Sequence, residues 1–152
     1  MQDLPHHYHV TAALEPEQFV SLSSPGLEPI ESAGPAEFGG PGDLWSPETL
    51  LIAAVAECLL LSFKAVARAG RLEWAGIRCD VEGVLERVDG KTRFTEIIER
   101  VTLDLPAGGN ADKAMRLLTK AEKTCLITNS LNADVHMEAD IRVAGSPAVR
   151  EA

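Results

Sequence analysis

Lysine and arginine are absent from the first 63 residues of this 152-residue chain, whereas nine acidic residues lie there. The remaining fourteen acids and all fourteen Lys and Arg residues follow, so the net charge of −9 resides in the N-terminal part. Nucleic acids and anionic membrane surfaces both need a basic surface on their partner, and this distribution argues against either. It is compatible with an acidic half that packs on a more basic half, including that of a second chain.

Cysteine is scarce, and nothing in the sequence has the spacing of a metal site. The three cysteines are Cys58, Cys79 and Cys125. They form no CxxC pair and no Cys/His pattern typical of zinc. His7 and His9 share one face of an extended segment beside His6, but no third ligand follows at a suitable spacing. We interpret the three histidines as a solvated terminal cluster, and we expect no metal and no cofactor.

Long apolar runs and leader features are also missing. No basic region followed by an apolar run opens the chain, so we expect no signal peptide and a cytoplasmic protein. The longest apolar stretch, residues 50–63, contains Glu57 and is shorter than a bilayer requires, which favours a buried core helix. The glycine-rich run Gly39–Gly42 lacks a Walker lysine and the glycine spacing of a dinucleotide fold, so we interpret it as a loop.

The order of hydrophobic patterns predicts a mixed fold. The expected elements are strands within 7–12, 18–22 and 27–32, a helix over 47–69, a hairpin of strands near 77–86 and 92–105, a helix over 111–123, a helical turn over 127–131 and a strand over 134–143. Asp89-Gly90 is a strong signal for the hairpin turn. Strands, helix, hairpin, helix and strand in this order indicate the α+β class. We expect one domain over residues 1–143 and a loose tail over 144–152.

The central helix has clear end signals. Ser46 can cap it, Pro47 suits its first position, Glu48 complements the positive end of the dipole, and Gly70 marks its stop. It is apolar nearly all round, which predicts a central, buried helix. One small sheet covers only part of such a helix, so a dimer is a reasonable source of the remaining cover.

Two of the cysteines leave their chemistry open. Cys58 lies in mid-helix and is either an inert buried thiol or a reactive one whose cation comes from another element. Cys125 follows Lys120 and Lys123, where local positive charge favours a thiolate, although an ordinary half-buried cysteine fits equally well. Cys79 alternates with apolar residues on a strand and is interpreted as part of the core.

Glu48 has two interpretations. It precedes Cys58 by ten residues, which is about 15 Å along a straight helix. It is therefore either a plain partner of the helix dipole or a member of a site at Cys58 that a second element or chain completes.

Two separated motifs resemble one known family. Residues 46–58 contain a Pro-Glu pair, a leucine, two alanines and Cys58 ten residues after the glutamate, behind a glycine-rich loop. Residues 121–131 contain Cys125 followed by Thr-Asn-Ser-Leu. Both segments resemble the OsmC/Ohr family of osmotically inducible and organic hydroperoxide resistance proteins. The order of elements matches as well, so the resemblance covers nearly the whole chain.

The resemblance implies an intertwined homodimer with two sites at its interface, in each of which the two cysteines lie close in space. It also implies that the protein is a cofactor-free organic hydroperoxide reductase. Cys58 would attack the terminal oxygen of the peroxide as a thiolate and become a sulfenic acid. Cys125 would condense with it to a disulfide, and a dithiol such as dihydrolipoamide would restore both thiols. Glu48 matches the family glutamate that holds an arginine beside the thiolate. The apolar neighbours of Cys58, with Trp45 and Phe63, predict a preference for bulky apolar peroxides.

The chain departs from the family in two places. The family arginine normally lies in the N-terminal strands or loop, where this chain has no Lys or Arg, and Arg93 in the hairpin is a possible substitute. Leu126 stands where the family has a proline after its second cysteine. This outlying position keeps two alternatives open: an impaired dimer that binds a small apolar ligand, and a redox sensor whose disulfide changes a partner interaction.

Overall fold

The computed structural model describes residues 3–145 and 149–151 and has the predicted α+β class. By its internal contacts the chain falls into two compact units, Met1–Leu51 and Ile52–Ala152, so that the boundary lies within the long helix. The elements of the first unit are β1 (Thr11–Ala13), β2 (Val20–Ser23), β3 (Ile30–Ser32), the 3-10 turn η1 (Ala36–Phe38) and the start of α1 (Pro47–Ala69). The second unit contains the rest of α1, β4 (Gly76–Val88), β5 (Lys91–Leu105), α2 (Ala111–Lys123), η2 (Thr128–Ser130), β6 (Asp134–Val143) and β7 (Val149–Glu151).

The first unit is a small antiparallel sheet in the order β1-β2-β3. The three strands lie where the sequence predicted strands, but η1 occupies part of the expected loop. Large apolar side chains of this unit are exposed, among them Tyr8, Leu14, Leu27 and Trp45. A three-stranded sheet needs a buried apolar face for stability, so these side chains require cover.

Helix α1 begins and ends as its sequence predicts. The Ser46 hydroxyl accepts from the Thr49 N–H (3.2 Å), and the Thr49 hydroxyl accepts from the Ser46 N–H (2.8 Å), which closes a reciprocal cap. After Ala69 the left-handed residue is Arg71 (φ 51°), not Gly70. Gly70 instead allows the Leu117 side chain of α2 to pack close to the backbone, because a Cβ at position 70 would lie 2.8 Å from Cδ1 of Leu117.

The second unit is built on a four-stranded sheet in the order β4-β5-β6-β7. Asp89 (φ 50°) and Gly90 (φ 77°) form the predicted turn between β4 and β5. Strand β6 runs parallel to β5, and α2 makes the crossover between them. Within the tail that was expected to be loose, β7 pairs with the edge of β6, whereas residues 146–148 and 152 lie outside the described residues.

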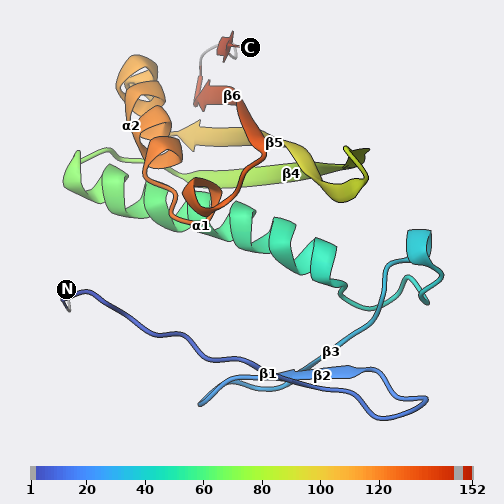
Figure 1. Cartoon of the computed structure of the whole chain (residues 1–152). Helices are drawn as coiled ribbons and strands as arrows, with labels where there is room; N and C mark the ends of the chain where they lie inside the picture. The colour runs from blue at the N-terminus through green and yellow to red at the C-terminus, as the bar shows by residue number, and fades with distance from the viewer. Residues whose placement is uncertain (1–2, 146–148, 152) are drawn as a thin grey trace. The chain divides into compact units, whose positions relative to one another are not determined.

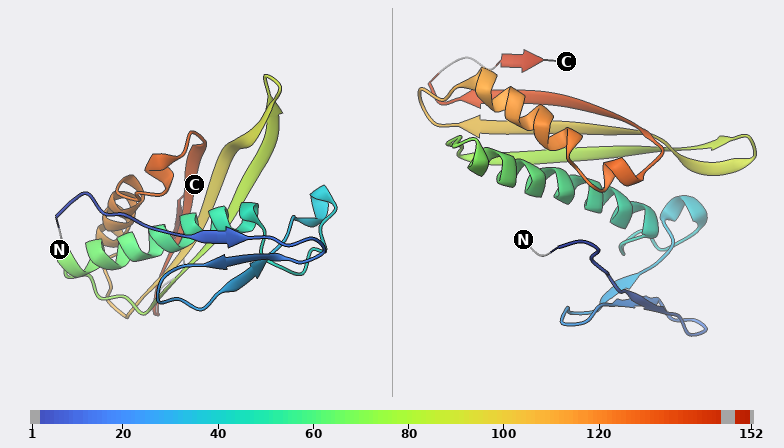
Figure 2. Two further views of the ribbon diagram at one scale, coloured as in Figure 1. Left: turned by 60° about the horizontal axis from the view of Figure 1, so that its bottom comes forward. Right: turned by 60° about the vertical axis from the view of Figure 1, so that its left-hand side comes forward.

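Within this unit, α1 and α2 cover the same face of the sheet (Figures 1 and 2). Their buried side chains meet those of β5 and β6 in one core, which contains Leu59, Phe63, Ala67, Val101, Leu103, Leu105, Ala114, Leu118, Ala121, Ala139 and Ile141. Helix α2 is capped by Asn110, whose side-chain oxygen accepts from the Lys113 N–H (2.8 Å). The other face of the sheet carries exposed ion pairs such as Arg100–Glu82 (2.9 Å).

Helix α1 is buried on one side only. Val55, Leu59, Phe63 and Ala67 face the core, whereas Leu61 is 57% exposed. The prediction of a buried helix is therefore confirmed for the face of α1 that packs on the sheet. It is wrong for the opposite face within a single chain, because the sheet covers only one side of the helix. With 23 residues, α1 is also longer than the predicted apolar stretch and is long and apolar enough to cross a membrane. One such helix is weak evidence for a span, because the core helix of a soluble protein passes the same test.

Candidate functional site

The structure brings together the side chains of Cys58 and Cys125. Cys58 lies in the middle of α1 and is half-buried, whereas Cys125 follows the end of α2 and has no exposed surface. The two thiols are near enough for Cys58 to raise the pKa of the Cys125 thiol, and both cysteines are free. Neighbouring thiols on separate elements are candidates for a disulfide.

Cys58 also faces an open hollow of about 480 Å³, here called the α1 hollow. Its lining residues are Ala54, Glu57, Cys58, Leu61, Ser62, Ala65, Leu126 and Ile127. This volume lies in the usual range for small-molecule sites, and the lining is mostly apolar. Phe63, expected near Cys58, instead faces the core, where its ring packs edge-on against Trp74 with centroids 5.6 Å apart. A small apolar molecule in the hollow meets Cys58 before the buried Cys125.

Burial raises the pKa of the Cys125 thiol. Hydrogen bonds from the Thr128 side chain and backbone oppose this increase, and the neighbouring Cys58 adds to it. The net effect favours the neutral thiol at Cys125. Its reactivity therefore depends on how well the groups around it accommodate a negative charge.

Glu48 lies in the first turn of α1, ten residues before Cys58. Its Oε2 atom is buried and has no hydrogen-bond partner among the described residues. A buried carboxylate oxygen without a donor is costly, and such a position suits a cationic partner. Glu48 is thus more than a solvated partner of the helix dipole.

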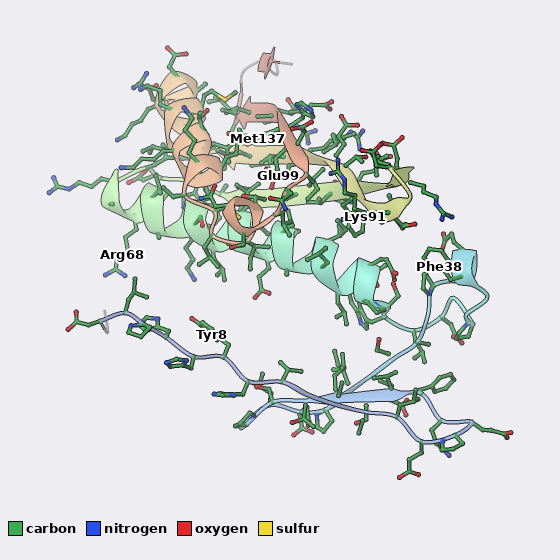
Figure 3. All side chains as sticks on the ribbon, viewed as in Figure 1. Tyr8, Phe38, Arg68, Lys91, Glu99 and Met137 are labelled. Carbon is green, nitrogen blue, oxygen red and sulfur yellow. The ribbon has the colours of Figure 1, made fainter. Side chains whose placement is uncertain are left out.

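The cation expected beside Cys58 has no counterpart among the contacts of the described residues. Within residues 3–145 and 149–151, no Lys or Arg forms a recorded hydrogen bond or ion pair with Cys58 or Glu48. Arg93 is exposed, and its guanidinium donates to the Phe94 carbonyl oxygen (3.5 Å). Arg68 extends from α1 on the side away from the sheet (Figure 3). The substitution of Arg93 for the family arginine stays a prediction.

Glu99 is a buried acid that the sequence interpretation passed over. It has no exposed surface, and neither carboxylate oxygen has a hydrogen-bond partner in the described part of the chain. It projects from β5 in the part of the sheet that α1 and α2 cover (Figure 3). Burial, and secondarily Glu122, raises its pKa to about 7. The sequence feature that could have identified Glu99 is its position between Ile97 and Val101, where an acid interrupts an alternation of apolar residues.

Cys79 takes the core position that the sequence predicted. It is partly buried and packs against the core formed by the helices and the sheet. Burial, then the charges of Glu99 and Asp80, raises the pKa of this thiol to about 12. The Cys79 thiol therefore stays protonated near neutral pH, and Cys79 serves as a natural control for the other two cysteines.

Comparisons with known proteins agree on one family. A family model described as OsmC-like protein matches residues 40–140. An uncharacterized protein, YmaD of Bacillus subtilis, is 28% identical over 116 residues, which cover 73% of this chain and 77% of that protein. The residues that the family model matches include both Cys58 and Cys125.

Solved structures show the same fold. An OsmC-like protein of unknown function from Vibrio cholerae superimposes with a TM-score of 0.80 at 17% identity, covering 89% of this chain and 99% of that one. An organic hydroperoxide resistance protein OsmC from Legionella pneumophila gives a TM-score of 0.70 at 23% identity, covering 91% and 100%. At these identities the likeness establishes the fold, and the chemistry must be argued from the residues.

Proposed function

The chain belongs to the OsmC-like protein family, and from this premise we propose that it is a thiol-dependent peroxidase that reduces organic hydroperoxides. The observation that carries the proposal is the neighbouring pair of free thiols, Cys58 and Cys125, beside the apolar α1 hollow that Cys58 lines. Two thiols suffice for this reduction, so the proposed reaction needs no cofactor.

The difference in solvent exposure between the two cysteines determines which one attacks the peroxide and which one resolves the sulfenic acid. Cys58 lines the hollow, so its thiolate attacks the terminal oxygen of the bound hydroperoxide. The O–O bond breaks, the substrate leaves as an alkoxide that takes up a proton, and Cys58 becomes a sulfenic acid. Cys125, which has no exposed surface, is shielded from the peroxide and acts as the resolving thiol.

The second half of the cycle uses the contact between the thiols. The Cys125 sulfur attacks the sulfenic sulfur, a disulfide forms, and water leaves with the thiol proton. A dithiol such as dihydrolipoamide then reduces the disulfide and regenerates both cysteines. Close contact of the thiols traps the sulfenic acid before further oxidation.

The proposal includes a homodimer in the cytoplasm. The exposed face of α1 carries Leu61 (57% exposed), and Leu126 beside it is 65% exposed, so an apolar surface surrounds the hollow. Apolar side chains of the β1-β2-β3 sheet are exposed as well. A second copy would cover surfaces of this kind. It would also be a source of the cation that Glu48, with its unpartnered buried oxygen, would hold beside the Cys58 thiolate.

Steady-state turnover of cumene hydroperoxide with dihydrolipoamide tests the proposal. Cys58→Ser should abolish turnover, and Cys125→Ser should reduce it by at least about a hundredfold, because each removes a thiol that the cycle requires. Cys79→Ser is the matched control and should retain most activity. Equal turnover in all four proteins would refute the proposed roles.

A second candidate is a binding module for a small apolar ligand. It is favoured by the apolar α1 hollow together with the lack of a recorded cationic partner for Cys58 among the described residues. In this case cumene hydroperoxide and its alcohol bind with similar affinity, and neither changes the number of free thiols. Calorimetric titration with the alcohol, combined with a thiol count after peroxide, separates the two functions.

A further inference from the structure

Of the eight described residues that line the α1 hollow, Glu57 is the one that carries a charge. It immediately precedes Cys58 on α1, and successive residues of a helix are turned by about 100° from one another. The Glu57 carboxylate therefore flanks the thiol and does not cover it. Since both side chains border the same space, a molecule that enters the hollow to reach Cys58 passes close to this carboxylate.

No cation pairs with Glu57 within residues 3–145 and 149–151. Glu57 is exposed and takes part in none of the recorded ion pairs. Lys64 and Lys123 are the basic residues nearest in sequence to the two lining segments, and neither lines the hollow. Exposed carboxylates are ionised near neutral pH, so a negative charge borders a hollow whose lining is mostly apolar.

We propose that Glu57 selects the substrate of the α1 hollow by charge, so that neutral organic hydroperoxides reach Cys58 and hydroperoxides that carry a carboxylate are repelled. The inference rests on the proposed function, since it takes Cys58 as the thiol that attacks a hydroperoxide, and it narrows the substrate class. Hydrocarbon and ester hydroperoxides belong to the favoured class, and the hydroperoxides of free fatty acids belong to the disfavoured one. The apolar lining suits the body of either kind, so the discrimination comes from the carboxylate of Glu57.

Coulomb repulsion gives the size of the effect. Two like charges about 6 Å apart in water change a rate or an affinity about threefold, and apolar side chains that exclude water strengthen the interaction. Dissolved salt weakens it, because the screening length falls from about 10 Å at 0.1 M to about 3 Å at 1 M. A contribution of Glu57 through packing or shape would be the same at both salt concentrations. Salt dependence therefore separates the two kinds of contribution.

The direct test is the alkylation of Cys58 in Cys79→Ser/Cys125→Ser protein, where it is the only thiol. Iodoacetamide and iodoacetate have nearly the same shape and differ in charge. Both react with the same thiolate, so the ratio of their rates does not depend on the ionised fraction of Cys58. Glu57→Gln should lower the ratio of the iodoacetamide rate to the iodoacetate rate about threefold at low salt. Glu57→Asp, which keeps the charge, should retain the original ratio.

Two controls assign the effect to this carboxylate. Glu73→Gln removes the same charge from an exposed residue that does not line the hollow, and it should leave the ratio unchanged. In about 1 M salt the ratio of the protein with Glu57 should approach that of Glu57→Gln. An unchanged ratio in Glu57→Gln overturns the proposal. An equal decrease in Glu73→Gln also overturns it, because the net charge of the chain would then be responsible.

A matched pair of peroxides tests the substrate class in protein with all cysteines present. Cumene hydroperoxide with a carboxylate in the para position is compared with its methyl ester, and the loss of free thiols is followed. Glu57→Gln should reduce the preference for the ester about threefold, whereas a structural defect would slow both reactions together. A preference that Glu57→Gln leaves unchanged contradicts the inference. If neither peroxide oxidises the thiols, the peroxidase proposal fails, and the alkylation ratio still decides whether Glu57 selects by charge.

Discussion

Glu99 on β5 and Glu122 in the last turn of α2 lie close enough for the charge of Glu122 to raise the pKa of Glu99. Burial is the larger cause, since Glu99 has no exposed surface, and together they raise this pKa to about 7 from an ordinary 4.5. Cys79 of β4 faces the same carboxyl group, and the residue paired with Glu99 on β6 is the uncharged Met137. A neutral carboxyl group therefore fits this part of the core better than a carboxylate.

The free energy of unfolding should fall as the pH rises through this range. The folded chain keeps the Glu99 proton up to about pH 7, whereas the unfolded chain releases it near pH 4.5. The stabilisation is complete below about pH 4.5 and is lost by the time the pH passes about 7. The expected loss is on the order of 3 kcal/mol. Urea unfolding at a series of pH values measures it.

Two variants assign this pH dependence to its source. Glu99→Gln keeps the shape of the side chain but never ionises, so the decrease between about pH 4.5 and 7 should disappear. Glu122→Gln removes only the like charge, and it should move the upper end of the range to a lower pH by a smaller amount. If Glu99→Gln retains the full decrease, another group is responsible.

The exposed apolar face of α1 predicts the state of association. Leu61→Glu places a charge in the centre of this face, and burying that charge would weaken a dimer by at least about a hundredfold in Kd. Light scattering after size exclusion should show a dimer for the wild type and a monomer for the variant. Lys64→Glu is the control, because Lys64 is exposed on the same helix but does not line the hollow. A monomeric wild type would rule out the homodimer.

Gly83 on β4 is predicted to be a packing requirement. A Cβ atom there would lie 2.4 Å from Cδ1 of Ile52 and 2.8 Å from Cε1 of Phe94. Gly83→Ala should therefore lower the free energy of unfolding by about 1–3 kcal/mol, since α1 or the Phe94 ring must move. Gly34→Ala is the control, because a Cβ at Gly34 meets nothing within 4 Å. Equal denaturant midpoints for the two variants would contradict the close approach.

The apolar lining of the α1 hollow predicts the order of substrates. Cumene hydroperoxide buries apolar surface in the hollow and hydrogen peroxide does not, so kcat/KM should be at least about tenfold higher for the organic peroxide. Initial rates with each peroxide under the same reductant measure the ratio. Equal or faster turnover of hydrogen peroxide would mean that the hollow does not select the substrate.

Local signals predicted the elements of the fold well. The Ser46 cap sets the start of α1, and Asp89-Gly90 sets the hairpin turn. These features depend on a few neighbouring residues, so the sequence displays them directly. The parallel pairing of β5 with β6 and the edge strand β7 depend on segments far apart in the chain. Hydrophobic periodicity does not specify such pairings.

The candidate site was predicted in part. Family resemblance singled out Cys58 and Cys125, and the structure adds that the two thiols are neighbours, which no spacing in the sequence implies. Glu99 was missed because an acid in an apolar alternation usually marks a break in the buried face, and only the packing of α1 and α2 shows that it stays inside. Glu57 adjoins Cys58 in the sequence, but only the structure shows that both line one hollow.

Intact-mass analysis after one equivalent of cumene hydroperoxide tests the central claim most directly. The account predicts that the wild type loses two thiols and forms one disulfide between Cys58 and Cys125 within seconds. Cys125→Ser should stop at a sulfenic acid on Cys58, and Cys58→Ser should remain unchanged. If all three proteins keep their thiols for many minutes, the chain is not a peroxidase, and the ligand-binding function takes its place.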